Sequence, residues 1–185
     1  MDKTNQGFTL IETLVAISIL VVAIVAPMSL ATQSLSSAFY ARDQVTAFHL
    51  AQEAIEAVRS IRDGNILKNA YGEETDLMGD IPTDQPFIID TRDNSITPCT
   101  SGICPQLKSD GNFYAYGADP YDSGETGWTT TRFTRTINAA WVNVDNHDEM
   151  RVSVTVAWKT GVFQARTFTI SQDLYRWVND GTASQ

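Results

Sequence analysis

The sequence contains few of the residues on which catalytic and metal sites most often depend. It has two histidines, His49 and His147, and two cysteines in 185 residues. It has no Gly-rich phosphate loop, no His-Glu-x-x-His and no Gly-x-Ser-x-Gly pattern. A zinc site would need two ligands besides the cysteines, and nothing pairs either histidine with a nucleophile. We therefore expect a protein that is not an enzyme and that holds neither a metal nor a cofactor.

Basic residues are also scarce. Lys and Arg number 13 against 22 Asp and Glu, so the formal net charge is −9. Proteins that bind nucleic acid without regard to sequence neutralise phosphates with Lys and Arg. The linear sequence has no basic patch, since Arg132 and Arg135 are too isolated to form one. Nucleic acid is therefore an unlikely partner.

Acidic residues gather in two turn-rich stretches, where calcium sites are worth weighing because hard cations prefer carboxylate and carbonyl oxygens. One stretch holds Asp119, Asp122 and Glu125, and the other runs from Asp145 to Glu149. Neither fits the twelve-residue calcium loop with glycine at its sixth position. We interpret both stretches as solvated turns.

Charge is almost absent between residues 8 and 41, where Glu12 is the one charged residue. The segment from Leu14 to Ala31 is almost wholly apolar. About 20 such residues, each rising ~1.5 Å along a helix, cross a ~30 Å hydrocarbon layer. A plain signal-anchor would satisfy the same pattern. A carboxylate near mid-bilayer costs about 2.5 kcal/mol or more, so Glu12 should lie near the interface or meet a partner.

The residues before this segment favour a more specific interpretation. A short polar leader, with Lys3 as its one basic residue, ends at Gly7, and the apolar segment follows it. Gly7-Phe8-Thr9-Leu10-Ile11-Glu12, continued by Leu14-Val15-Ala16-Ile17, closely resembles the class III leader of type IV pilins and type II secretion pseudopilins. Relatives often carry a more basic leader. The resemblance implies cleavage after Gly7 by a prepilin peptidase and N-methylation of Phe8. It also implies that Glu12 pairs with the terminal amine of a neighbouring subunit.

The same resemblance implies a location and a set of partners. The chain would cross the cytoplasmic membrane once with its C-terminal domain outside, and later lie in a cell-surface filament. Its partners would be other pilin subunits, the peptidase, the inner-membrane assembly platform and the membrane. Pro27 interrupts the apolar helix and should kink or locally open it. A tolerated membrane proline is the equal alternative.

Periodicity predicts an α+β fold, and we divide the chain into six segments. Apolar residues recur at three- and four-residue steps through Ala51, Ile55 and Val58, so the helix becomes amphipathic and should pack on a sheet, ending at Gly64-Asn65. Glu56 and Arg59 are spaced for an ion pair. The segments are a leader (1–7), an apolar helix (8–33), an amphipathic helix (34–63), an irregular region (64–128), an antiparallel sheet (129–178) and a tail (179–185).

The sheet follows from alternation in the last third of the chain. Phe133, Arg135, Ile137, Ala139 and Trp141 share one strand face, and Met150, Val152, Val154, Val156 and Trp158 share a face of the next. A third strand is expected over Val162–Ser171, and Leu174–Val178 should continue the edge. The result is a meander of three or four antiparallel strands with one buried face. This pattern agrees with the fold that the pilin resemblance implies.

The region 64–128 is rich in turn residues, with short strands expected at Pro86–Asp90 and Asn112–Tyr116. Cys99 and Cys104 lie in one of its loops, and export from the cytoplasm favours a disulfide between them. Its aromatics form either a ligand surface or, as we favour, a satellite core. The members of this aromatic set are Phe113, Tyr114, Tyr116, Tyr121 and Trp128.

The function we expect is that of a structural subunit, with a minor pilin favoured over a major one. The resemblance to minor pilins lies in the helix Leu50–Arg59 and the strand Val152–Trp158. The alternatives are a pseudopilin of a type II secretion system, and a tip adhesin or DNA-uptake subunit that binds through the region 64–128. A membrane-anchored domain that never polymerises is a third alternative.

Overall fold

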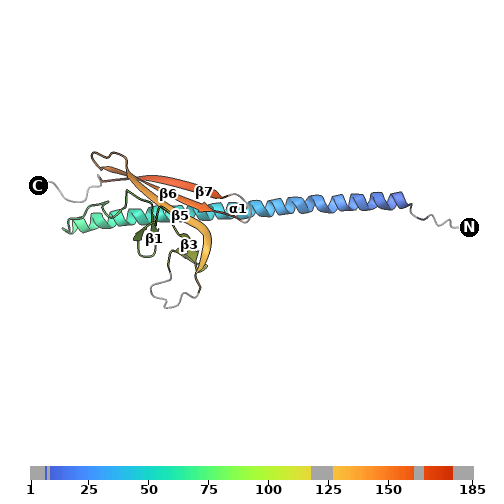
Figure 1. Cartoon of the computed structure of the whole chain (residues 1–185), viewed down its shortest axis with the longest axis horizontal. Helices are drawn as coiled ribbons and strands as arrows, with labels where there is room; N and C mark the ends of the chain where they lie inside the picture. The colour runs from blue at the N-terminus through green and yellow to red at the C-terminus, as the bar shows by residue number, and fades with distance from the viewer. Residues whose placement is uncertain (1–6, 8, 118–126, 161–164, 177–185) are drawn as a thin grey trace, which may run out of the picture. The chain divides into compact units, whose positions relative to one another are not determined.

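One α-helix, α1, runs from Leu10 to Ala70 and is followed by a sheet (Figure 1). The computed structural model describes residues 7, 9–117, 127–160 and 165–176. The chain divides into two units, residues 1–42 and 43–185, and α1 contributes to both. The predicted α+β class, a long N-terminal helix with a C-terminal antiparallel sheet, is confirmed.

The helix end predicted at Gly64-Asn65 is wrong, because α1 continues through both residues to Ala70. Gly64 costs the helix about 1 kcal/mol relative to alanine. A Cβ added there would meet no atom within 4 Å, so close packing does not explain this glycine. Asn65 is buried, and its side-chain amide donates to the carbonyl oxygens of Asp76 and Leu77 at 3.3 and 3.5 Å. These bonds hold the segment that follows the helix.

The helix ends at a Schellman motif around Gly72. The Gly72 N–H donates to the carbonyl of Asn69 at 2.9 Å, and the Glu73 N–H donates to the carbonyl of Lys68 at 3.0 Å. Gly72 has a φ of 89°, a left-handed conformation that glycine adopts without steric cost. The second glycine, eight residues after the predicted one, therefore stops the helix.

Among the described residues, seven strands form one sheet, and all of the pairings found there are antiparallel. The antiparallel meander predicted for the last third, with three or four strands, is confirmed and has three. The region 64–128 is less irregular than predicted, because it adds four short strands to the sheet. The strands are β1 (Phe87–Asp90), β2 (Ser95–Pro98), β3 (Gln106–Ser109), β4 (Tyr114–Ala115), β5 (Thr129–Trp141), β6 (Glu149–Trp158) and β7 (Arg166–Tyr175).

The sheet branches at its longest strand, β5. Along one edge, β5 pairs with β6, and β6 pairs in turn with β7. Along the other edge β5 changes partner: Ile137 pairs with Phe87 of β1, and Thr134 pairs with Gln106 of β3. Arg135 lies at the point where the partner changes. The short strands are thus attached to the meander through this one edge of β5.

Among the described residues, the third strand of the meander, β7, begins at Arg166. It extends through Leu174 to Tyr175, in agreement with the predicted continuation of the edge. Residues 161–164 and 177–185 lie outside the described residues, and with them the start of the predicted strand, Val178 and the tail.

The core lies between one face of the sheet and the helix residues from Ala47 to Val58. In Figure 1, β5, β6 and β7 run alongside this part of α1. Every predicted inward residue of β6 is buried, and so are four of the five in β5, with Trp141 half-buried. Small residues on the helix allow the sheet and its larger side chains to approach closely. The buried alanines of this helix face are Ala47, Ala51, Ala54 and Ala57.

Candidate functional site

The first described residues of α1 form a helix cap. The Thr9 hydroxyl accepts a hydrogen bond from the backbone N–H of Glu12 at 3.3 Å, and its carbonyl accepts one from Thr13 at 3.2 Å. Thr9 and Glu12 thus have the spacing of a capping box, in which the carboxylate lies at the positive end of the helix dipole. This local role was not predicted, although Thr-x-x-Glu before an apolar run is its usual signal.

The predicted processing residues surround this cap. Gly7 is exposed, whereas Phe8 lies outside the described residues. Glu12 is exposed and, within the part of the chain that the structure describes, forms no ion pair. Its carboxylate is therefore accessible to a partner beyond this chain.

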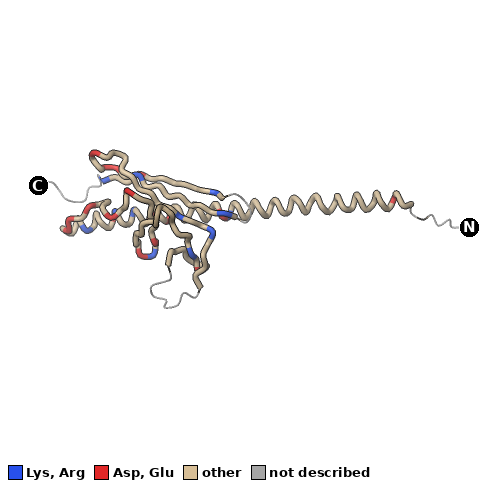
Figure 2. The backbone as a smooth tube through the Cα atoms, in the orientation of Figure 1, with Lys and Arg blue, Asp and Glu red and all other residues tan. Residues whose placement is uncertain are grey.

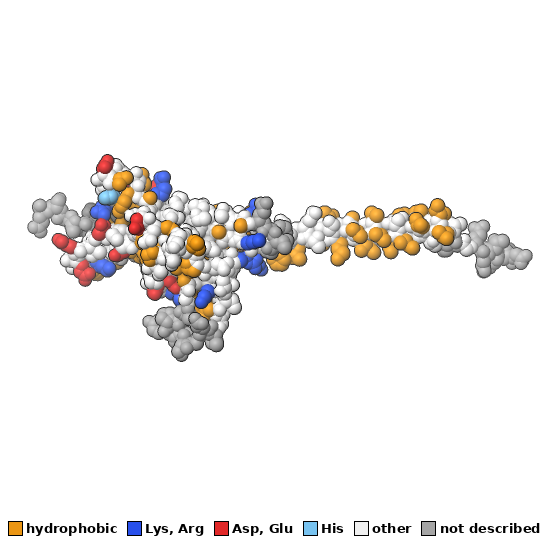
Figure 3. All heavy atoms as spheres, viewed as in Figure 1, with side chains coloured by type: hydrophobic (Ala, Val, Ile, Leu, Met, Phe, Trp, Pro, Cys, Tyr) orange, Lys and Arg blue, Asp and Glu red, His pale blue; other side chains and the backbone are white. Residues whose placement is uncertain are grey.

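The helix surface that follows is apolar on all sides. Figure 3 shows hydrophobic side chains along this part of α1, and Figure 2 shows that it carries almost no charge. By length and composition, α1 can cross a membrane. Such a helix needs lipid or other helices around it, because water solvates it poorly. Its large exposed residues are Leu10, Ile11, Leu14, Val15, Ile17, Ile19, Leu20, Val21, Val22, Ile24, Val25, Met28, Leu30, Leu35, Phe39 and Tyr40.

Comparison with known families agrees with this geometry. A family model described as the prokaryotic N-terminal methylation motif matches residues 2–26, which include Gly7, Phe8 and Glu12. This match supports the type IV pilin and pseudopilin family. No curated protein and no solved structure matches the chain. Proteins with this motif are structural rather than enzymatic, and they are anchored in a membrane before they assemble.

Pro27 lies inside α1 of this pilin-like protein, and the helix continues through it without interruption. A proline lacks the N–H that would bond the carbonyl four residues earlier, here that of Ala23. The kink or local opening at Pro27 and its equal alternative, a tolerated membrane proline, both stay predictions.

The C-terminal unit is organised around a fully buried arginine, Arg135. Its guanidinium donates to the carbonyl oxygen of Ile89 at 2.8 Å and to that of Leu50 at 3.1 Å. It also contacts the carboxylate of Glu53 at 3.3 Å and the hydroxyl of Tyr116 at 3.4 Å. One side chain of β5 thereby joins the helix, β1 and the segment after β4. The alternation placed Arg135 on the buried face, but only the structure shows why a charge is stable there.

Burial and neighbouring charges shift the pKa values of two groups near Arg135, Tyr116 and Asp90. Burial raises the pKa of the Tyr116 phenol above its usual value, although the charge of Arg135 acts in the opposite direction. Burial also opposes ionisation of Asp90, but hydrogen bonds and charge from Arg92 outweigh it and hold the pKa of Asp90 below its usual value. Tyr116 is consequently neutral and Asp90 ionised at neutral pH.

A second buried charge lies where the helix enters the C-terminal unit. Asp43 is buried, and its carboxylate accepts hydrogen bonds from Arg132 at 2.9 Å and from the Thr160 hydroxyl at 2.7 Å. These partners belong to β5 and to the residues after β6. Arg132, which the sequence analysis considered only as a basic-patch residue, instead ties the sheet to the helix.

Cys99 and Cys104 form the predicted disulfide, with Cα atoms 4.7 Å apart. Both cysteines are buried against Ile88, and Tyr116 packs on the same small cluster. Tyr114 packs on the main core, and its ring meets that of Phe133 edge-on. Tyr116 therefore agrees with the satellite-core interpretation, whereas Tyr114 belongs to the main core. Phe113 is exposed, and Tyr121 lies outside the described residues.

The remaining candidate residues have local roles. Of the two acidic stretches, Asp119, Asp122 and Glu125 lie outside the described residues. In the other, the side-chain oxygen of Asn146 accepts a hydrogen bond from the backbone N–H of Asp148 at 3.3 Å. No cluster of three potential metal ligands occurs in the described ranges. His49 packs beside Phe48, and His147 packs beside Trp141.

Proposed function

We propose that this protein is a minor structural subunit of a type IV pilus-like filament. Before assembly it crosses the cytoplasmic membrane once, with residues 43–185 outside. The observation that carries the proposal is the methylation motif followed by a helix whose apolar side chains are exposed on every side up to Tyr40. A bundle of such helices buries these side chains in the filament as lipid does before assembly.

Processing would precede assembly. A prepilin peptidase cleaves after Gly7 and methylates the amine of Phe8, and the inner-membrane platform then adds the subunit to the filament. Removal of residues 1–7 leaves Phe8 directly before the Thr9 cap. The new amine is thus four residues from Glu12 along the chain.

Glu12 would fix the register between neighbouring subunits. A carboxylate within an apolar bundle is tolerated when an opposite charge meets it, and is strongly unfavourable when it stays unpaired. The methylated amine of Phe8 on an adjacent subunit is a partner of the required charge. Subunits in any other register would leave Glu12 without one.

The minor role is proposed from the helix Leu50–Arg59 and the strand Val152–Trp158, which resemble minor pilins and minor pseudopilins. The same motif also begins the pseudopilins of type II secretion systems. The abundance of the subunit in sheared filaments, and the machine with which it copurifies, separate these assignments.

The decisive experiment uses paired substitutions at the cap. Glu12→Gln removes the charge but keeps the size and helix propensity of the side chain, whereas Thr9→Ala removes the hydroxyl that accepts from the N–H of Glu12. We expect Glu12→Gln and Glu12→Ala to remain in the membrane and to be lost from sheared filaments. Thr9→Ala should still be incorporated. Immunoblots of the membrane and sheared fractions measure both.

Mass spectrometry of the same fractions tests processing. The sheared subunit should lack residues 1–7 and carry one added methyl group, and Gly7→Val should keep its full mass. Incorporation of Glu12→Gln at the wild-type level would refute the charge pairing and leave Glu12 with its capping role alone. A full-length mass confined to membranes would refute the filament assignment and favour a plain anchor.

A further inference from the structure

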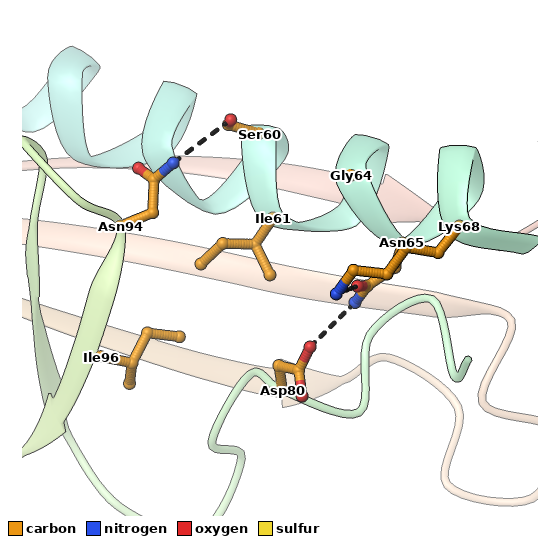
Figure 4. A pocket seen from close by; sticks show the side chains of 8 residues that line it. All are labelled: Ser60, Ile61, Gly64, Asn65, Lys68, Asp80, Asn94 and Ile96. Atoms are coloured by element: carbon orange, nitrogen blue, oxygen red, sulfur yellow. Dashed lines mark hydrogen bonds between the residues drawn. The ribbon is translucent and has the colours of Figure 1, made fainter. Parts of the chain in front are cut away.

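A pocket of about 350 Å³ opens between the C-terminal end of α1 and the residues around β2. Its size lies at the lower end of the range of roughly 300–1,000 Å³ typical of small-ligand sites. Figure 4 shows helix side chains along one wall and, opposite them, Asp80 and Asn94 from loops and Ile96 from β2. The lining residues are Ser60, Ile61, Gly64, Asn65, Lys68, Asp80, Asn94 and Ile96.

Gly64 keeps the pocket open. It lies within α1, where glycine weakens a helix, and its φ is not in the left-handed region. No neighbouring atom would obstruct a Cβ at this position. Neither backbone conformation nor packing therefore accounts for the glycine. The absence of a side chain does account for part of the space in the pocket wall.

The polar groups of the pocket form two small sets. Asn65 is buried and donates to the carboxylate of Asp80 at 3.1 Å, while its side-chain oxygen accepts from the Lys68 ammonium at 3.4 Å. Across the pocket, the Asn94 amide donates to the Ser60 hydroxyl at 3.4 Å. Both 3.4 Å contacts are long for hydrogen bonds, so ligand groups can replace them at small cost.

The character of the lining indicates the class of ligand. One ammonium and one carboxylate flank Asn65, so an anion would meet Asp80 and a cation would meet Lys68. Amide and hydroxyl groups supply donors and acceptors together, as sugar hydroxyls require, because each sugar hydroxyl both donates and accepts. Ile61 and Ile96 are half-buried and present apolar surface to the C–H groups of a ring.

We propose that this pocket binds one residue of an uncharged saccharide. The ring lies against Ile61 and Ile96, and its hydroxyls bond to Asp80, Lys68 and the Asn94 amide. The pocket lies entirely in the unit of residues 43–185, and none of its lining residues belongs to the apolar segment up to Tyr40. A surface subunit with such a pocket would attach its filament to a glycan.

The test uses the full chain, isotope-labelled and held in a detergent without a sugar head group. D-glucose, D-galactose, D-mannose and N-acetyl-D-glucosamine are the probes, each titrated while amide NMR signals are followed. A small open pocket gives weak binding, so we expect a Kd of about 1 mM for at least one sugar. Shifts should be confined to residues 60–68, 80 and 94–96.

Matched leucine substitutions establish the location. Gly64→Leu fills the pocket with a good helix former and should weaken binding at least about tenfold. Gln44→Leu places the same side chain at an exposed helix position outside the pocket and should leave Kd unchanged. Gly64→Ala, the mildest change, should retain the fold and weaken binding less than leucine does.

Three results would overturn the proposal. The first is the absence of shifts with every sugar at about 50 mM, well above the expected Kd. The second is binding that Gly64→Leu does not weaken although its spectrum shows a folded protein. The third is binding of L-alanine or acetate, used as zwitterionic and anionic probes, in place of the sugars. Incorporation of Gly64→Leu into filaments tests the proposed structural role separately.

Discussion

Replacing Arg135 with methionine tests whether the buried guanidinium holds the C-terminal unit together. Methionine has a similar length but no donors, so the exchange removes every hydrogen bond of the head group while leaving most of the packing. The carbonyl of Leu50 lies in the helix and keeps an intrahelical partner. Glu53 is 42% exposed and can be solvated by water. The carbonyl of Ile89 loses its 2.8 Å partner in a buried position.

The expected cost follows from this accounting. A buried carbonyl left without a partner costs about 1–3 kcal/mol. Removal of the buried charge offsets part of this loss of stability, because replacing buried ions with apolar groups is often neutral or favourable. We therefore expect Arg135→Met to lower the free energy of unfolding by about 2 kcal/mol, or the Tm by roughly 4–8 °C for a unit of this size.

Thermal unfolding by circular dichroism measures this change, and hydrogen exchange locates it. Exchange should accelerate in β1, whereas the pairing of β6 with β7 should keep its protection. Arg151→Met is the matched control: Arg151 also bonds a carboxylate, that of Asp173 at 2.8 and 3.0 Å, but its side chain is 56% exposed. This control should leave the Tm unchanged within error. A stability of Arg135→Met equal to or above that of the wild type would refute the reasoning.

Two further predictions concern the glycines within and just beyond the end of α1, Gly64 and Gly72, and the buried phenol of Tyr116. Gly72→Ala should destabilise the protein by about 1–2 kcal/mol, because the φ of Gly72 is in the left-handed region. Gly64→Ala should stabilise it by up to about 1 kcal/mol, because Gly64 lies within the helix and has room for a Cβ. Changes of the same sign in the Tm of the two variants would contradict the assigned helix end. Because the pKa of Tyr116 is higher in the folded than in the unfolded chain, its neutral phenol contributes to the free energy of unfolding below about pH 10. This contribution is lost as the pH rises through the folded pKa. Above about pH 10, the free energy of unfolding of Tyr116→Phe should therefore fall less steeply than that of the wild type. In a pH titration followed by phenolate absorbance, the variant should show one tyrosine fewer that ionises above the usual pKa.

Much of the architecture could be predicted because its signals are local. Alternation over ten or more residues fixes both the strands and the buried face of β5 and β6, and the apolar stripe fixes the packing face of the helix. β2 and β3 could not be predicted in this way. Each has four residues with one large apolar side chain, so no period is visible, and pairing with a neighbouring strand determines them.

The end of α1 and the ion pair of Asp43 with Arg132 could not be predicted from the sequence, for two different reasons. Gly64-Asn65 has the composition of a stop signal, but Asn65 finds its partners in a segment more than ten residues later, so the helix continues. Asp43 and Arg132 are separated by 89 residues, and no local pattern relates them. The methylation motif, by contrast, could be recognised from Gly7, Phe8 and Glu12, because it is defined by linear spacing.

The disulfide hairpin has a consequence for what this surface can carry. Cys99 and Cys104 are buried and joined, while the residues between them are exposed. The N–H of Cys99 also donates to the carbonyl of Pro86 at 2.9 Å, so the base of the hairpin is fixed to the start of β1. With the ends held covalently, doubling the length of the tip adds only about 0.6 kcal/mol of loop-closure entropy. Positions 100–103 can therefore accept a foreign peptide while the strands on either side keep their register, which makes this tip a display position on the protein surface.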